Sequence, residues 1–296
     1  PVPRVVDVDD GIRLDQLSLR GLNRCGAAIR AMSGDATSRK DVADRLVSFF
    51  YEHMKDKDGK LALSLVRCFE TREVSELPDE DRSIVQSLVP DPDPQSKCLQ
   101  LISTAGEKEE WNDTSLSQSH RVIPLPSESA VQRLPMIARL IRELGLDVGG
   151  VVNSNANLIV DTVETKVFHV PEARGCSDIP AQEEFVIPFG IRSVVGFGDL
   201  LPNGNLFAVI MFSKVPISPE CALLFSHLSL SVRIALLPFI DAEDKLQARL
   251  MATDRLLRNH EEVVARQESQ LLRALDELNR SAAALERTGL DFEKAL

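Results

Sequence analysis

A seven-residue repeat runs through the last fifty residues of the chain. Its apolar positions are Leu250, Leu257, Val264, Leu271, Leu278, Leu285 and Phe292. An apolar period of seven makes an α-helix supercoil around a partner helix. The companion positions, from Leu246 to Ser281, are mostly polar or small, which weakens a two-stranded seam but keeps its register. We therefore predict that residues 241–296 form a coiled-coil signalling helix that pairs with a second copy of the chain.

Net charge, apolar runs and cysteines indicate where the protein is located and which partners it lacks. The formal net charge of −11 argues against binding to nucleic acid or to an anionic membrane, because both need a concentrated basic surface. The longest apolar runs, residues 206–212 and 234–240, are far shorter than the roughly 20 residues of a membrane-spanning helix. The five cysteines form no Cys-x-x-Cys pair, as is typical of reduced thiols. We expect a cytoplasmic protein without membrane insertion.

Residues 15–240 carry mixed helix and strand signals, after an expected upstream linker at residues 1–14. Helical spacing predicts helices over residues 14–33, 38–56, 135–144 and from 219 to Pro238, and short apolar runs predict strands over residues 61–69, 98–105, 167–170, 185–187, 191–197 and 206–212. Pro202-Asn-Gly-Asn205 predicts a hairpin between the last two strands. The helix after Pro219 is apolar on almost every side, through Ile234, so we expect it to be buried. Together these signals predict an α+β fold, an antiparallel sheet with flanking helices.

This layout and the segment 184–198, EFVIPFGIRSVVGFG, resemble the GAF sensory domains of bacterial sensor histidine kinases. Segments 111–112, 120–127 and 135–140 are similar to a subgroup found upstream of kinase modules. The resemblance covers roughly residues 15–240. It implies a GAF-like fold and a dimeric input domain of a two-component signalling protein, which pairs through its N-terminal and C-terminal helices. It also implies a covalently linked output domain, and no kinase or cyclase motif occurs between Pro1 and Leu296.

A second resemblance concerns ligand binding. Asp178-Ile-Pro is similar to the phytochrome GAF motif, which implies that Asp178 faces a bilin; alternatively, Asp178 caps a turn with its side chain. The family attaches bilin through a Cys-His pair, and neither Cys176 nor Cys221 is followed by histidine, so we expect no covalent attachment. His169 and Cys176 can share a pocket wall or bind haem. Trp111 can stack on a planar ligand or close the edge of a core.

Enzymatic and metal-binding motifs are absent from the sequence. There is no Gly-x-Ser-x-Gly elbow, phosphate loop or metalloprotease helix, and the five histidines have no metal-ligand spacing. We expect no catalytic residue, no metal and no required cofactor in this fragment. The sequence thus predicts a sensory and dimerisation input module that acts through its coiled coil. A bilin- or haem-binding sensor and a ligand-free dimerisation scaffold remain the alternatives.

Overall fold

A computed structural model describes residues 11–117, 120–153 and 167–240. By internal contacts the chain divides into two units, residues 1–241 and 242–296, and the described elements belong to the first. The predicted coiled-coil seam lies outside the described residues.

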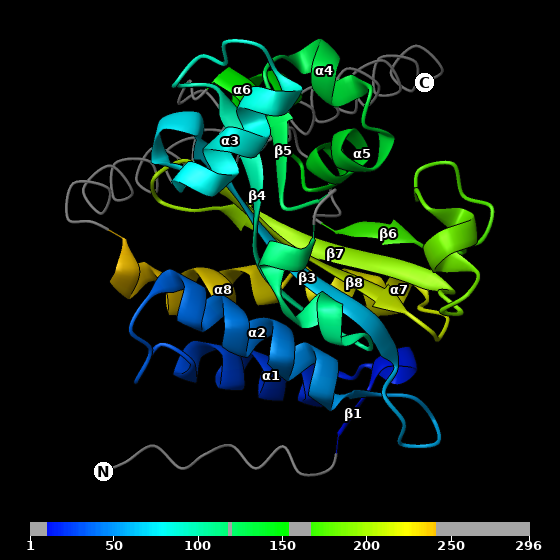
Figure 1. Ribbon diagram of the computed structural model, residues 1–296. Helices are drawn as coiled ribbons and strands as arrows, with labels where there is room; N and C mark the ends of the chain where they lie inside the picture. Colours follow the sequence, from blue (N-terminus) through cyan, green and yellow to red (C-terminus); the bar gives the residue numbers. More distant parts are fainter. Residues whose placement is uncertain (1–10, 118–119, 154–166, 241–296) are drawn as a thin grey trace, which may run out of the picture. The chain divides into compact units, whose positions relative to one another are not determined.

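A six-stranded antiparallel sheet forms the centre of the described unit, in the order β5-β4-β3-β8-β7-β6 (Figure 1). Its strands are β3 (Leu63–Glu73), β4 (Lys97–Gly106), β5 (Val122–Leu125), β6 (Phe168–Val170), β7 (Ser193–Leu200) and β8 (Leu206–Ser213). A small parallel pair, β1 (Ile12–Arg13) and β2 (Met54–Lys55), precedes it. Together with the helices around it, this sheet confirms the predicted α+β class.

Helices cover both faces of the sheet. One face packs against α1 (Leu19–Ala31), α2 (Arg39–His53), α7 (Pro219–Phe225) and α8 (Leu228–Leu236), and a first apolar core fills this layer. The other α-helices are α3 (Asp79–Leu88), α4 (Glu128–Gln132), α5 (Pro135–Glu143) and α6 (Val148–Asn153), of which α4, α5 and α6 contribute to a second core on the opposite face. In Figure 1, α3 to α6 lie on the side of the sheet away from α1 and α2. The sheet therefore separates two cores.

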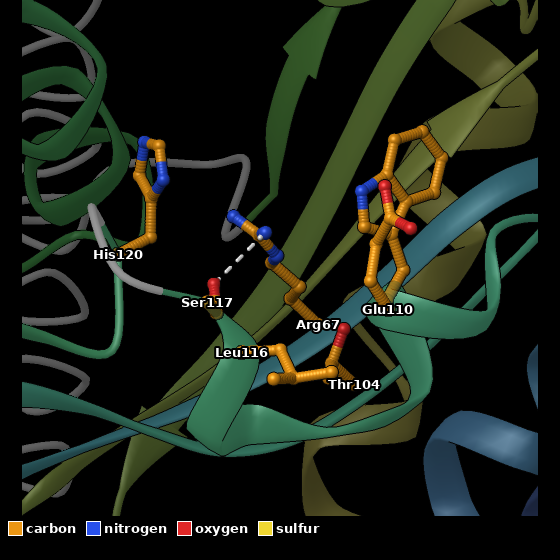
Figure 2. Close-up of a pocket in the computed structure, with 7 residues that line it drawn as sticks. Arg67, Thr104, Glu110, Leu116, Ser117 and His120 are labelled. Carbon is orange, nitrogen blue, oxygen red and sulfur yellow. Dashed lines mark hydrogen bonds between the residues drawn. The ribbon is translucent and has the colours of Figure 1, made fainter.

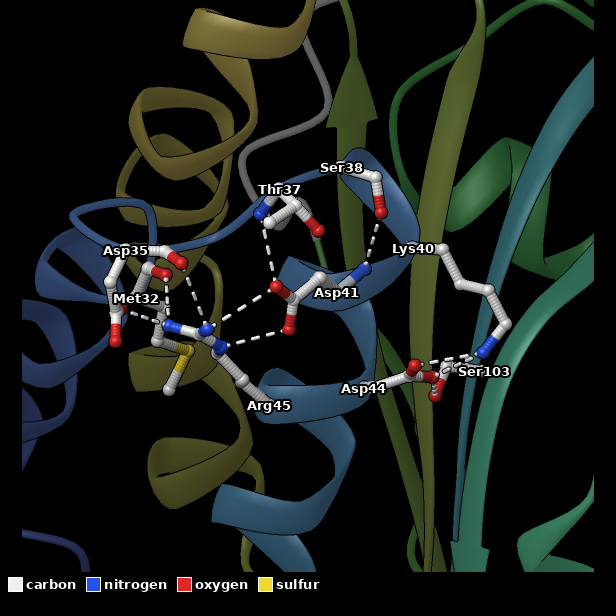
Figure 3. Close-up of polar contacts among 9 residues, drawn as sticks. All are labelled: Met32, Asp35, Thr37, Ser38, Lys40, Asp41, Asp44, Arg45 and Ser103. Atoms are coloured by element: carbon white, nitrogen blue, oxygen red, sulfur yellow. Dashed lines mark hydrogen bonds and ion pairs between the residues drawn. The ribbon is translucent and has the colours of Figure 1, made fainter.

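Local signals explain several helix ends. Ser38 and Ser218 are N-caps of α2 and α7: their hydroxyls accept from the backbone N–H three residues later, Asp41 at 3.1 Å and Cys221 at 3.2 Å. Helix α2 is also tied to the sheet, because the Ser103 hydroxyl of β4 donates to Asp44 at 2.6 Å (Figure 3). Arg45 closes the preceding turn through Asp41 and Asp35.

The predicted hairpin between β7 and β8 is confirmed. Leu201 N–H donates to the Asn205 carbonyl at 2.7 Å, and Gly204 has a φ of 80°, which glycine adopts without strain. The strand predicted at residues 185–187 is wrong. Residues Gln182–Val186 form a π-helical turn, in which two successive N–H groups donate to the Ala181 carbonyl at 2.9 and 3.1 Å. A short apolar run fits a strand or a buried helical turn equally well, so periodicity could not distinguish them.

The expected complete burial of the last helix is also wrong. In α7 and α8, Phe225, Leu228 and Val232 are buried against the sheet. Leu230 is 60% exposed and Ile234 43%, and they lie one helical turn apart. By length and composition alone, Pro219–Phe239 is apolar enough to cross a membrane, a test that core helices also pass. The helix is thus a core element with one uncovered apolar stripe.

Gly198 provides a test of the β7–β8 packing. A Cβ at this position would overlap the Phe207 carbonyl oxygen of the neighbouring strand. We expect Gly198→Ala to lower the free energy of unfolding by about 1–3 kcal/mol, because the strands must move apart. Gly34→Ala is the control: its Cβ would lie 3.4 Å from the nearest atom, the Ala31 carbonyl oxygen. Urea denaturation measures both, and equal stabilities of the two variants would contradict this packing.

Candidate functional site

A cavity of about 560 Å³ lies on the sheet face opposite α1 and α2. It is an open cavity bordered by strands β3, β4, β5 and β8, by α5 and by the segment 177–185. This volume is within the usual range for sites that hold a small organic molecule. A ligand-free scaffold would be expected to pack this space solid. The geometry therefore favours a binding site.

The period of two along β3 places the floor of the cavity. Leu65, Arg67 and Phe69 line it, whereas Val66 and Cys68 belong to the helical core on the other face. Two apolar residues of the adjacent strand β8, Ile210 and Phe212, continue the floor. The floor is apolar except for one arginine.

Trp111 forms an aromatic wall of the cavity together with the π-helical turn. Its ring centroid lies 5.4 Å from that of Phe185 and 4.6 Å from that of Phe189. The short helical turn that carries Trp111 is tied to the end of β4, because the Asn112 side chain accepts from Gly106 N–H at 2.9 Å. Trp111 is therefore held in place beside the cavity.

Asp178 lines the cavity and belongs to an ionic network. Its carboxylate lies 2.7 Å from the Arg139 guanidinium of α5. Arg139 also pairs with Glu143 at 2.7 Å and donates to the His169 carbonyl at 2.7 Å. The network thus joins the cavity wall to α5 and to β6.

The four ligand-binding residues predicted from sequence lie in different places. Asp178 and Trp111 line the cavity, and His169 and Cys176 are not among its lining residues. The His169 imidazole hydrogen-bonds through Nε2 to the Ile217 carbonyl at 2.9 Å, so that nitrogen carries the proton. Cys176 is half-buried and packs against the second core. Asp178 and His169 are linked through Arg139, which pairs with the Asp178 carboxylate and donates to the His169 carbonyl.

Arg67 stands between the main cavity and a smaller one of about 270 Å³, because it lines both. Figure 2 shows its guanidinium pointing toward the side on which Ser117 and His120 lie. One terminal nitrogen donates to the Ser117 hydroxyl at 3.2 Å, and the buried Nε has no hydrogen-bond partner among the described residues. Burial lowers the pKa of Arg67 to about 10. A guanidinium still carries its charge at neutral pH under these conditions.

His120 lines both cavities beside Arg67. Burial lowers the pKa of its imidazole, and the positive charge of Arg67 lowers it further. His120 is therefore held in the neutral form at pH 7. A negative charge placed next to Arg67 would remove one of the two causes.

Sequence reasoning missed Arg67 and did not select His120 as a binding residue. The available signal was a charged residue at the middle of Leu65-x-Arg67-x-Phe69, on the inward side of a predicted strand. Such a position is costly for an arginine unless it has a partner or a function. The pattern alone does not reveal whether a counter-ion is nearby.

The described part of the chain offers no metal site and no cysteine in the main cavity. No group of three or more His, Cys, Asp or Glu residues there has metal-binding geometry. Cys221 lies in the core on the opposite face of the sheet, where its thiol donates to the Leu14 carbonyl at 3.1 Å. It is therefore separated by the sheet from the main cavity.

Comparison with known proteins gives only remote similarities. No family model matches the sequence, and no curated protein matches it. A solved structure described as the structure of the GAF domain is 9% identical, with a TM-score of 0.42, over 79% of this chain and 98% of that one. The chromophore-binding domain of a bacteriophytochrome from R. palustris is 9% identical, with a TM-score of 0.38, over 75% and 63%. The phycoerythrobilin-bound GAF domain of a cyanobacterial phytochrome is 11% identical, with a TM-score of 0.37, over 79% and 98%. At these values the similarities identify no ligand and no activity for this chain.

The lowered pKa of His120 predicts a specific loss of stability in acid. Since the folded state resists protonation, the stabilising contribution of the neutral imidazole is present above the ordinary pKa of 6.5 and is lost as pH falls below it. We expect His120→Gln to lose less stability than wild type between pH 7.5 and pH 5.5, as measured by urea denaturation. Arg67→Met should also lose less stability over this pH range, because it removes the positive charge that lowers the pKa of His120. An identical pH dependence in all three proteins would contradict this environment.

Proposed function

We propose that residues 15–240 form a GAF-type sensory module that binds a small organic ligand in the main cavity. The cavity of about 560 Å³ carries this proposal. The sequence resemblance to GAF domains and the antiparallel sheet with helices on both faces support it. In this proposal the module is a homodimeric, cytoplasmic input domain of a histidine kinase, without activity of its own, and residues 241–296 pass its state to an output domain.

A chain of polar contacts offers a route from ligand to output. Asp178, on the cavity wall, pairs with Arg139, and Arg139 binds the backbone of His169. The His169 side chain binds the carbonyl of Ile217, the residue before the Ser218 cap of α7. A ligand that displaces Asp178 would thereby act on the helices that precede residue 241. Such a network could couple the cavity to the last helices of the unit. The coupling free energy cannot exceed the difference in the ligand's affinity for the two conformations of the module.

A noncovalent bilin is a second candidate ligand, because Asp178 of the Asp-Ile-Pro motif lines the cavity. A haem bound through His169 has less support, since its Nε2 already bonds to Ile217 and the residue does not line the cavity. An absorbance spectrum of the purified protein distinguishes these coloured ligands from a colourless one.

The ligand proposal is tested with N-phenyl-1-naphthylamine, an uncharged dye that fluoresces in apolar surroundings. Wild type should bind it saturably. Met136 lines the cavity and is only partly buried, so Met136→Trp should fill the space and weaken binding by about tenfold or more. Met136→Leu keeps the side-chain volume and serves as the control. Equal dye affinity in both variants, or no saturable binding to wild type, would contradict a ligand cavity.

The dimer proposal rests on the stripe formed by Leu230, Ile234 and Leu237, which are 60%, 43% and 42% exposed. Leu19 of α1, a helix that packs against α8, is 68% exposed. We assign this surface to a second copy of the chain, because the heptad seam that follows it in sequence also needs an identical partner. Burial of the stripe would explain why it is apolar.

Sedimentation equilibrium tests the role of the stripe. Leu230→Glu with Ile234→Glu should weaken the dimer by about tenfold or more, because each charge would be buried at the interface. Leu88→Glu is the matched control, since Leu88 is also 60% exposed but lies on α3. A dissociation constant unchanged by the double substitution would remove α8 from the interface.

A further inference from the structure

Of the four charged side chains that line the main cavity, two are paired, one is exposed to solvent, and Arg67 alone is both unpaired among the described residues and largely buried. Asp178 pairs with Arg139 at 2.7 Å, and Lys108 pairs with Glu110 at 3.3 Å. Glu184 lies at an exposed position of the rim. Arg67 has no ion pair with any described residue, although it is largely buried. A buried charge without a partner destabilises a fold, so its presence calls for a ligand or another explanation.

A second unsatisfied polar group lies next to Arg67 on the adjacent strand. Thr104 of β4 is the register partner of Arg67 in β3, and both residues line the smaller cavity. The Thr104 hydroxyl is buried and has no hydrogen-bond partner among the described residues. Arg67 Nε is therefore a buried donor without an acceptor, and the neighbouring Thr104 hydroxyl, which can donate or accept, is unsatisfied as well. Buried polar groups in proteins are usually hydrogen-bonded, and an acceptor placed here could satisfy both groups, because the hydroxyl can donate to it as the guanidinium does.

The shapes of the two cavities indicate how such a ligand would lie. Arg67, Trp111 and His120 line both cavities, so they mark the region where these spaces meet. The smaller cavity is lined mostly by polar groups, including Ser117 and Thr104. The Glu110 carboxylate also lines it, and its charge is paired with Lys108 at 3.3 Å. The larger one has an apolar floor and the aromatic wall of Trp111 and Phe185. One space suits a charged group, and the other suits an aromatic body.

We propose that the ligand of this module is an amphiphilic organic oxyanion, with a flat apolar body in the main cavity and one anionic group in the smaller cavity. Arg67 binds the anionic group, with Thr104 and Ser117 as hydroxyl donors. His120 stands beside the group as a further hydrogen-bond donor. This inference rests on the proposed function and adds the chemical class of the ligand. Carboxylate, phosphate and sulfonate share the required chemistry, since each offers several acceptor oxygens to a guanidinium.

Two dyes with the same aromatic body isolate the role of the anion. 1-Anilinonaphthalene-8-sulfonate carries a sulfonate, and N-phenyl-1-naphthylamine has the same rings without it. Fluorescence titration of the full chain gives a dissociation constant for each dye. We expect Arg67→Met to weaken sulfonate binding by about tenfold to a hundredfold, the usual value of a charge-assisted hydrogen bond. Binding of the uncharged dye should change by less than about threefold.

Three further variants serve as controls. Arg67→Lys keeps the charge and should retain part of the sulfonate affinity. Thr104→Val removes one hydroxyl donor at nearly constant volume and should weaken the sulfonate dye alone. Arg192→Gln removes an exposed arginine just before β7 and should change neither dye.

Thermal unfolding without dye distinguishes a ligand-binding arginine from a structural one. Removing an unpaired buried charge should raise the Tm of Arg67→Met, whereas loss of a structural contact would lower it. A lower Tm together with equal losses for both dyes would overturn the proposal. So would sulfonate binding that is insensitive to Arg67→Met.

The outcomes also separate this inference from the proposed function. If the uncharged dye binds in a Met136-dependent manner but Arg67→Met leaves the sulfonate dye unaffected, the cavity binds ligands and only the oxyanion assignment is wrong. If neither dye binds wild type, the proposed function fails, and the oxyanion assignment fails with it.

Discussion

The alternation of side chains along the two central strands is the constraint on which the rest of this structure depends. In β3, Val66 and Cys68 complete a packed core with the helices on one face, while Leu65, Arg67 and Phe69 face a cavity on the other. Because side chains alternate with a period of two, a shift of β3 by one residue would move the core residues into the cavity and the cavity residues into the core. The face under α1 and α2 is packed by the first core, and the opposite face combines the second core with the cavity.

The uncompensated charge of Arg67 makes sense in this arrangement. Binding sites often keep groups that are unfavourable in the empty protein, because the ligand later satisfies them. The rigid position of Trp111 follows the same logic, since a wall held by Phe185 and Phe189 loses little freedom on binding. The contacts from Asp178 through Arg139 and His169 to Ile217 then connect the bound state to the last helices of the unit.

The fold was predictable where the signals were local. The caps at Ser38 and Ser218 and the Asn203-Gly204 turn are fixed by residues within a few positions of each other. The turn at Gln182–Val186 was not predictable, because its apolar residues pack against partners distant in sequence, such as Trp111.

The candidate site was predictable only in part. Asp178 and Trp111 stood out by motif and by rarity. Arg67 did not, because its importance lies in the absence of a counter-ion, which only the folded arrangement reveals. The uncovered stripe on α8 was missed for a similar reason: composition shows that a helix is apolar but not how much of it the sheet covers.

The central claim is that ligands enter the cavity on the sheet face opposite α1 and α2. Methyl NMR tests it most directly, with spectra of the isoleucine and methionine methyl groups recorded as N-phenyl-1-naphthylamine is added. The account predicts shifts of Met136, Ile123 and Ile210, which line the cavity. Shifts confined to Ile234, on the exposed stripe of α8, would show that the dye binds the surface instead and would contradict the account.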